Sequence, residues 1–166
     1  DLYRKGEIKK EVLSSLRFNL TLQDFNIIDE ILSKQIGDDY KRISPRKVNL
    51  FPYAIEILEY LFPTYKLHII TNGFSEVQTI KLETSGMDKY FVDIITSEEA
   101  GVKKPHPDIF NFSFEKTGAL PNESIMIGDD YEVDIIGARE VNMRQIFFDF
   151  DKKYKKNDST YYINDL

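Results

Sequence analysis

The chain has 166 residues, of which 42% are hydrophobic and 30% are charged, and its formal net charge is −6. This much apolar material suffices for one core, or for a core with a small second lobe. The acidic balance argues against a nucleic-acid polymer as partner, because no basic stripe is present to neutralise its phosphates. The absence of cysteine excludes a disulfide scaffold, a thiolate zinc site and a cysteine nucleophile.

The first third of the chain has the periodicity of helices. Apolar residues recur at helical spacing over residues 7–36. Asp24 is the expected N-cap of the second helical stretch, and Gly37 is its expected stop. Residues 37–50 are polar and contain a proline, so we expect a linker between two lobes there.

From Leu50 onward the pattern alternates between helix and strand. Strands that alternate with helices of this length indicate βαβ units and a mainly parallel sheet, which is an α/β fold. The expected helices cover residues 53–62, 76–85, 108–117 and 133–143, and the expected strands cover residues 67–71, 91–96, 124–127, 145–148 and, as an edge strand, 161–163. No apolar run approaches the ~20 residues of a membrane span, and no signal peptide is visible, so we expect a cytoplasmic protein without a membrane partner.

The residues after the first expected strand could bind an anion, because ligands of an open parallel sheet bind at the carboxyl ends of its strands. Thr71 offers a hydroxyl, and Asn72 and Gly73 offer backbone N–H groups. Glycine lets an oxyanion approach the main chain closely, and the N-terminus of the next helix favours an anion further. The simpler interpretation is an ordinary strand-to-helix turn, and the tripeptide alone favours that one.

A lysine follows the second expected strand. Pro105 and Pro107 fix the backbone just before a helix, with Pro107 suited to the first helical turn, so Lys104 is held at a defined place. A lysine there can neutralise a phosphate and a nucleophilic carboxylate together. The alternative is that Lys103 and Lys104 are both surface residues, and these residues alone do not decide between the two.

Three aspartates, Asp129, Asp130 and Asp134, follow the third expected strand. Charges at the end of a buried strand are costly unless they are compensated. Mg²⁺ would compensate them, since it prefers oxygen ligands, takes one or two carboxylates and keeps several waters. The alternative is helix capping, in which Asp130 caps the following helix. Capping explains one aspartate well and three poorly.

These three strand ends, in this order, resemble motifs II, III and IV of the haloacid dehalogenase-like (HAD) hydrolase superfamily. The matching stretches are IITNGF, GVKKPHPDIF and IGDDYEVDIIGA. LFPYAIEILEYL and MIGDDYEVDIIGAREVNM look like the branch that includes the pyrimidine 5′-nucleotidases. The resemblance implies a HAD-like Rossmannoid core, with a three-layer parallel sheet, over residues 49–166. It implies that residues 1–48, including LYRKGEI, are part of a helical cap.

The resemblance also implies roles for the site residues. Thr71 would hydrogen-bond the transferring phosphoryl group beside the backbone of Asn72 and Gly73, and Lys104 would neutralise its charge. Asp129 would bind Mg²⁺ directly, Asp134 would complete or orient the metal shell, and Asp130 is a weaker candidate for the same role. The implied activity is hydrolysis of a small phosphorylated substrate, a nucleoside 5′-monophosphate, through an aspartyl-phosphate.

The family's nucleophile belongs to motif I, a strand followed by Asp-x-Asp-x-Thr or Val, which should lie upstream of the cap. We therefore expect the intact protein to be the enzyme and this chain alone to be inactive. The strand of motif I lies in the middle of the family's sheet, so its absence leaves two half-sheets with unpaired backbone groups. Asp149 and Asp151 could form a permuted motif I. Against this, Lys153 stands where Thr or Val belongs, and the segment lies where the next strand is expected.

Two other functions compete with this interpretation. The chain could be a non-catalytic module that binds phosphate, metal or another protein. A dehalogenase of the same superfamily is a third possibility, but the carboxylate cluster argues against it, because that chemistry needs no Mg²⁺.

Overall fold

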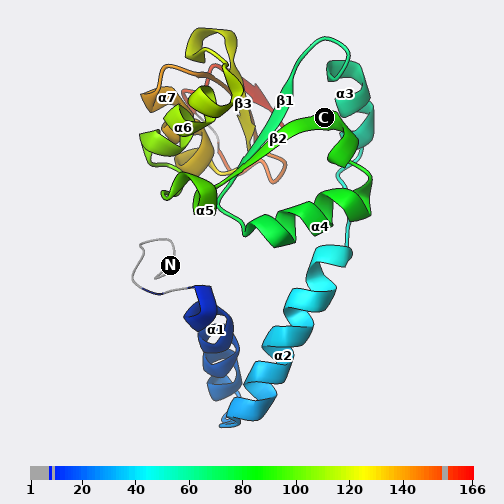
Figure 1. The fold of residues 1–166 in the computed structure, drawn as a ribbon, viewed down its shortest axis with the longest axis vertical. Coiled ribbons are helices and arrows are strands. Elements are labelled where there is room, and N and C mark those ends of the chain that lie inside the picture. Colours follow the sequence, from blue (N-terminus) through cyan, green and yellow to red (C-terminus); the bar gives the residue numbers. More distant parts are fainter. Residues whose placement is uncertain (1–7, 9, 155–156) are drawn as a thin grey trace. The chain divides into compact units, whose positions relative to one another are not determined.

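The chain folds into two units, residues 1–48 and residues 49–166, which Figure 1 shows in colours that follow the sequence. The computed structural model describes residues 8, 10–154 and 157–166. The expected start of the first helix, at residue 7, lies outside them. No helix in the described part of the chain is long and apolar enough to cross a bilayer.

The first unit is a pair of helices, α1 (Lys10–Asp24) and α2 (Glu30–Ile43), followed by a 3-10 turn (Ser44–Arg46). The two helices pack against each other, and the rings of Phe18 and Tyr40 lie 5.6 Å apart between them. This unit is all-helical in its described part, and we propose that it belongs to the cap.

Two expectations for the first unit were wrong. Asp24 is the last residue of α1, and the N-cap of α2 is Asp29, whose side chain accepts a hydrogen bond from Leu32 N at 2.9 Å. Gly37 does not end α2 but lies inside it and is buried. A small buried residue lets two helices approach closely. α2 continues to Ile43, through the first half of the expected linker at 37–50.

The second unit alternates helices and strands as expected. Every strand pair is parallel, which confirms the α/β fold with parallel strands. α4 and α6 each end at a glycine with a left-handed φ, Gly86 at 68° and Gly118 at 70°, a conformation in which a Cβ would be strained. The helices are α3 (Ala54–Leu61), α4 (Ser75–Ser85), α5 (Ser97–Ala100), α6 (Pro107–Thr117) and α7 (Gly137–Glu140), and the strands are β1 (Leu67–Thr71), β2 (Phe91–Thr96), β3 (Ile125–Gly128), β4 (Arg144–Phe148) and β5 (Tyr161–Ile163).

The helix expected over residues 133–143 differs in type and length. A π-helical segment (Tyr131–Ile136) comes first, and the short α7 continues it. Asn142 adopts a left-handed φ of 58°, and Met143 N donates to Ala138 O at 3.1 Å, so the chain turns before it reaches residue 143. Helix type was not readable from the apolar pattern, because a π segment shifts the periodicity by only one residue. Such segments are uncommon and frequently lie at functional sites.

The strands form two separate parallel sheets. β1 pairs with β2, while β3 pairs with β4 and β4 pairs with β5. Among the described strands, β1 and β3 therefore each have one edge without a strand partner. This is the interruption that the sequence predicts for a sheet whose central strand is missing.

One helix supports both sheets. Ile109 and Phe110 of α6 are fully buried, and they cluster with Ile95 of β2 and Met126 of β3. α6 also contacts β1 and α7. The two sheets are thus held together by apolar packing on α6, although no ladder of backbone hydrogen bonds joins them among the described strands.

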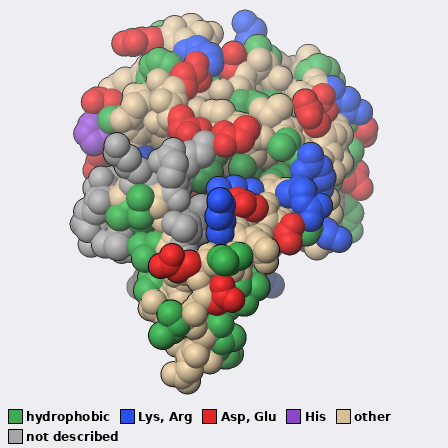
Figure 2. All heavy atoms as spheres, turned by 60° about the horizontal axis from the view of Figure 1, so that its bottom comes forward, with side chains coloured by type: hydrophobic (Ala, Val, Ile, Leu, Met, Phe, Trp, Pro, Cys, Tyr) green, Lys and Arg blue, Asp and Glu red, His purple; other side chains and the backbone are tan. Residues whose placement is uncertain are grey.

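Charged side chains of both signs are mixed on the surface. On the face shown in Figure 2, Asp and Glu side chains lie among Lys and Arg side chains rather than on a separate side.

The open sheet edges generate a prediction about the 166-residue chain on its own. Ile125 and Ile127 of β3 are 43% and 48% exposed, and an apolar, unpaired strand edge favours association with other chains. We expect the isolated chain to self-associate and to melt without a sharp transition, measured by gel filtration and by circular dichroism during heating. The full-length protein is the control. A monomeric chain with a cooperative melt would contradict the prediction.

Candidate active site

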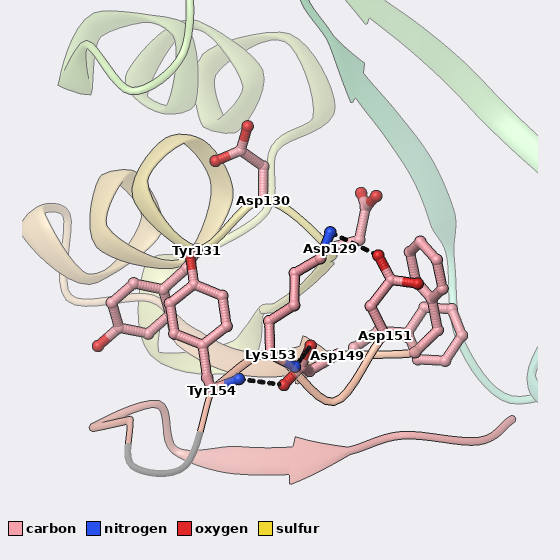
Figure 3. A pocket seen from close by; sticks show the side chains of 9 residues that line it. Asp129, Asp130, Tyr131, Asp149, Asp151, Lys153 and Tyr154 are labelled. Carbon is pink, nitrogen blue, oxygen red and sulfur yellow. Dashed lines mark hydrogen bonds and ion pairs between the residues drawn. The ribbon is translucent and has the colours of Figure 1, made fainter.

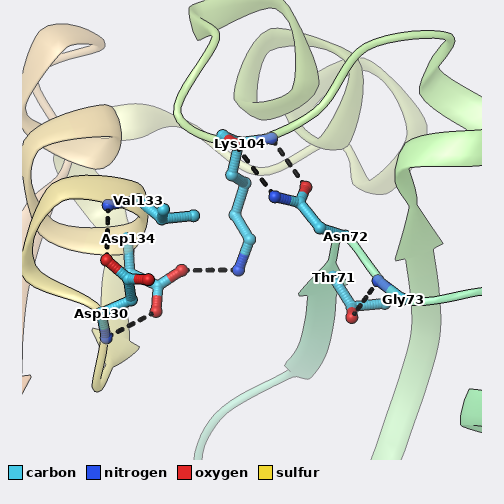
Figure 4. A network of polar contacts seen from close by, with 7 residues as sticks. All are labelled: Thr71, Asn72, Gly73, Lys104, Asp130, Val133 and Asp134. Atoms are coloured by element: carbon cyan, nitrogen blue, oxygen red, sulfur yellow. Dashed lines mark hydrogen bonds and ion pairs between the residues drawn. The ribbon is translucent and has the colours of Figure 1, made fainter. Parts of the chain in front are cut away.

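The carboxyl ends of β1 and β3 bring the expected site residues together in the second unit. Thr71 ends β1, Lys104 lies in the segment between α5 and α6, and Asp134 follows β3 (Figure 4). Because both strands end on the same side of a parallel arrangement, segments 30 residues or more apart in the chain meet there.

The Thr71 turn is held by a local hydrogen bond. Gly73 N donates to Thr71 Oγ1 at 2.9 Å. The hydroxyl hydrogen of Thr71 therefore stays available as a donor, whereas the Gly73 N–H already has an acceptor. A Cβ at position 73 would displace the side-chain amide of Gln78 and lie 3.1 Å from Thr71 Oγ1.

The N-terminus of α4, which the sequence suggested as an anion site, has an acceptor from its own chain. Ser75 N donates to Glu98 Oε2 at 2.9 Å, and Ser75 Oγ shares a hydrogen bond of 2.9 Å with Thr96 Oγ1. A carboxylate at a helix N-terminus is stabilised by the helix dipole. Sequence reasoning missed Glu98, because its partner lies 23 residues away.

Lys104 forms the buried centre of the site. Its Nζ lies 2.6 Å from Asp134 Oδ1, and the two side chains are only 9% and 8% exposed. The alternative that Lys104 is a surface residue is therefore wrong. Asp134 also accepts a hydrogen bond from Asp130 N at 3.3 Å through its other oxygen, so both of its carboxylate oxygens are engaged.

Gly128 makes room for this ion pair. A Cβ at position 128 would lie 2.7 Å from Asp134 Cγ, well inside van der Waals contact. Only glycine at the end of β3 thus lets the Asp134 carboxylate lie against the strand end and face Lys104.

The three aspartates differ in what they contact. Asp130 caps the π-helical segment by accepting from Val133 N at 3.1 Å, which is the capping alternative raised by the sequence. Asp134 pairs with Lys104. Asp129 is exposed and makes no hydrogen bond or ion pair with any residue that the structure describes. Asp129 alone is thus free to bind a ligand.

The donor set fits Mg²⁺ with one protein carboxylate. Among the described residues, no three His, Cys, Asp or Glu side chains are placed to hold a metal ion together. Mg²⁺ does not require such a cluster, since it usually keeps waters and is bound by one or two carboxylates plus substrate phosphates. The free carboxylate of Asp129 suits this role, and Asp134 suits the outer role of orienting its surroundings.

A cavity of about 270 Å³ opens beside Asp129 (Figure 3). Asp149 on its wall is only 4% exposed, and its carboxylate accepts hydrogen bonds from Lys153 N, Tyr154 N and Tyr162 OH at 2.9–3.1 Å. The cavity is lined by Asp129, Asp130, Tyr131, Phe148, Asp149, Phe150, Asp151, Lys153 and Tyr154.

These contacts argue against a permuted motif I at Asp149. β4 leads into it and pairs with β3, as expected for the strand after motif IV. A carboxylate with three donors is a poor nucleophile, because its lone pairs are already engaged. Burial raises the pKa of the Asp149 carboxyl, but the hydrogen bonds and the Lys153 charge outweigh burial and leave this pKa below its ordinary value. We infer that Asp149 orders the loop after β4.

Residues 6–151 match the family model described as haloacid dehalogenase-like hydrolase. The chain therefore belongs to the haloacid dehalogenase-like hydrolase family, and the resemblance stated from the motifs is confirmed.

Two relatives and one solved structure refine this assignment. Pyrimidine 5′-nucleotidase YjjG of Escherichia coli (strain K12) is 42% identical over 138 residues, which are 82% of this chain and 59% of that protein. Glyceraldehyde 3-phosphate phosphatase of Methanocaldococcus jannaschii is 32% identical over 132 residues, which are 76% of this chain and 58% of that protein. The crystal structure of the HAD-hydrolase YfnB from Bacillus subtilis, bound to magnesium, matches 99% of this chain and 72% of its own, with a TM-score of 0.85 at 27% identity. The chain thus spans less than two thirds of the length of these two relatives.

The buried ion pair generates a stability prediction for the full-length protein. Lys104→Met leaves the Asp134 charge buried without a partner, so we expect a loss of about 3–5 kcal/mol in the free energy of unfolding. The pair Lys116–Glu99 is the matched control, because its atoms lie 2.7 Å apart but its side chains are 30% and 42% exposed. We expect Lys116→Met to cost no more than about 1 kcal/mol. Urea denaturation measures both, and equal losses would contradict the prediction.

Asp149 generates a prediction about acid stability. A folded-state pKa below the ordinary value, about 4 for aspartate, means that the ionised form stabilises the fold. This stabilisation is fully present above the ordinary pKa and is lost as the pH falls through the lower, folded-state pKa. We expect Asp149→Asn to lower the melting temperature at neutral pH. Below about pH 4, we expect the melting temperature of this variant to fall less steeply with pH than that of the parent protein. Melting curves across the acid range measure this, and parallel declines in both proteins would speak against it.

Proposed function

We propose that the full-length protein is a Mg²⁺-dependent phosphomonoesterase that hydrolyses nucleoside 5′-monophosphates. The observation that carries this proposal is the constellation at the carboxyl ends of β1 and β3. The Lys104 Nζ lies 2.6 Å from Asp134 Oδ1. Thr71 ends β1, and Asp129, which has no partner among the described residues, follows β3. A cation, a hydroxyl donor and a free carboxylate together suit a phosphate and its metal ion.

Lys104 would provide the positive charge for the phosphate. Its ammonium has three donors, and the contact with Asp134 Oδ1 uses one of them. Asp134 thereby orients Lys104 while the remaining donors can hydrogen-bond to phosphate oxygens. Because the side chain is shielded from water, each of these contacts is stronger than it would be at the surface.

Thr71 would donate a second hydrogen bond to the phosphoryl group, since its hydroxyl oxygen already accepts from Gly73 N. Asp129 would hold Mg²⁺, with Asp134 and Asp130 in supporting positions around it. When bound, Mg²⁺ would neutralise phosphate charge and help to orient the phosphoryl group for transfer.

The nucleophile of the proposed reaction is an aspartate that lies outside these 166 residues. In the described part of the chain, Asp130 caps a helix, Asp134 pairs with Lys104 and Asp149 accepts three hydrogen bonds. Attack of this carboxylate on phosphorus would form an aspartyl-phosphate as the bond between phosphorus and the nucleoside oxygen breaks and the nucleoside leaves, and water would then hydrolyse the aspartyl-phosphate to aspartate and inorganic phosphate. The chain alone would thus supply the phosphate and metal contacts but no turnover.

The substrate class rests on the relatives. The 42% identity to a pyrimidine 5′-nucleotidase favours a nucleoside 5′-monophosphate, whereas the 32% identity to a glyceraldehyde 3-phosphate phosphatase supports the wider class of small phosphorylated molecules. Residues 1–48, as part of the cap, would contribute to the choice of leaving group.

A substrate panel tests the activity. We expect the full-length protein with Mg²⁺ to release inorganic phosphate from nucleoside 5′-monophosphates faster than from triose or sugar phosphates. Lys104→Ala should lower kcat by about 10²–10³-fold, the usual effect of removing one group that stabilises transition-state charge. Lys116→Ala is the control for loss of a lysine. No phosphate release from any monoester would overturn the proposal.

Metal removal tests the role of Asp129. We expect a chelator to abolish phosphate release and added Mg²⁺ to restore it. Asp129→Asn should raise the Mg²⁺ concentration needed for half-maximal activity by at least about tenfold, since it removes the proposed carboxylate ligand. Asp130→Asn keeps an oxygen that can cap Val133 N and should change this concentration much less. Equal effects of the two variants would contradict the assignment of the metal to Asp129.

A further inference from the structure

The side chain of Asn72 has contacts that its suggested backbone role does not explain. Asn72 Nδ2 donates to Lys104 O at 2.9 Å, and Lys104 N donates to Asn72 Oδ1 at 2.7 Å (Figure 4). Both partners are backbone groups, one a donor and one an acceptor, so the orientation of the amide is determined. The two hydrogen bonds join segments 32 residues apart in the chain.

This clamp holds the backbone from which the Lys104 side chain starts. A lysine ammonium lies at the end of a flexible four-carbon stem, so its position depends on where its backbone is held. Asn72 holds the backbone end, and Asp134 holds the ammonium at 2.6 Å. Asn72 itself is held in two ways. Its backbone carbonyl oxygen accepts a hydrogen bond from Ser97 Oγ at 3.5 Å, and the residue directly follows β1.

The clamp also ties the ammonium to the phosphate-binding turn. Asn72 lies between Thr71, whose hydroxyl would donate to the phosphoryl group, and Gly73, whose N–H fixes that hydroxyl at 2.9 Å. One side chain, that of Asn72, therefore links the Thr71 turn to the Lys104 backbone. Neither Pro105 nor Pro107 can replace the Asn72 side chain as a link between the two segments, because proline has no backbone N–H to donate and restricts only its own part of the chain.

We propose that Asn72 is a positioning residue for phosphoryl transfer, and that its side chain acts on the reaction through Lys104. This inference rests on the proposed function. A residue that only stabilised the fold would lower activity to the same extent whether or not Lys104 is present. A residue that acts through Lys104 loses its effect once the ammonium is gone.

A double-mutant cycle in the full-length protein separates these cases. Phosphate release from a nucleoside 5′-monophosphate is measured for the parent protein, Asn72→Ala, Lys104→Ala and the double variant. We expect Asn72→Ala to lower kcat about 10²-fold, the scale expected for a misplaced group, with a smaller change in KM. In the Lys104→Ala background, we expect Asn72→Ala to cause less than a threefold further loss.

Two further variants control for folding. Asn72→Ser is smaller and uncharged, and it cannot bridge Lys104 N and Lys104 O as the amide does, so we expect its kcat to lie between those of the parent and Asn72→Ala. Ser75→Ala removes a different contact between segments, to Thr96 Oγ1, and should leave kcat within about threefold of the parent, the scatter expected for a surface change. If Asn72→Ala does not fold, the Asn72→Ser cycle with Lys104→Ala decides the question.

The outcomes distinguish this inference from the proposed function. Equal losses caused by Asn72→Ala with and without Lys104, or no loss in either background, would overturn the positioning role. Unchanged activity of Lys104→Ala would overturn the proposed role of Lys104, whatever the Asn72 variants show. A large loss in the parent background and almost none without Lys104 supports the inference.

Discussion

The buried ion pair between Lys104 and Asp134 is the contact on which the site depends. Its charged atoms lie 2.6 Å apart, and both side chains are more than nine-tenths shielded from water. Removing two charges from water is costly, and a well-packed apolar pair of similar volume is often at least as stable. The pair is therefore better explained by where it holds a cation than by the stability it adds. A cation held in low dielectric at the end of a parallel sheet is a strong site for an anion.

The surrounding residues are arranged so that this pair can form. Gly128 leaves space for the Asp134 carboxylate, and Asp130 caps the π-helical segment that carries Asp134. Asn72 fixes the backbone of Lys104 with two hydrogen bonds. These contacts come from segments that follow three different strands, so the site exists only when the two sheets are held together. The apolar packing of Ile109 and Phe110 of α6 holds the two sheets together.

The interrupted sheet and the site have a common origin in the family fold. Thr71 ends β1 and Asp129 follows β3, and each of these two strands has one edge without a partner among the described strands. A strand between them would complete the sheet and bring its own carboxyl end to the same place. Family membership and the relatives of greater length agree with such a missing part. In the proposed function, a strand that supplied the nucleophile would also offer backbone hydrogen bonds to these two edges.

The sequence by itself determined the strands, most of the helices of the second unit and the family. These features depend on local causes: apolar runs make strands, prolines and glycines end helices, and the motifs lie at strand ends. It did not determine that α2 continues past Gly37, because this depends on burial within the helix pair. Nor did it decide between Asp130 and Asp134 as the second acidic residue beside the metal, because the two side chains are identical in chemistry. Only the tertiary structure decided that Asp134 meets Lys104, because partners 30 residues apart are brought together by packing and not by the local pattern.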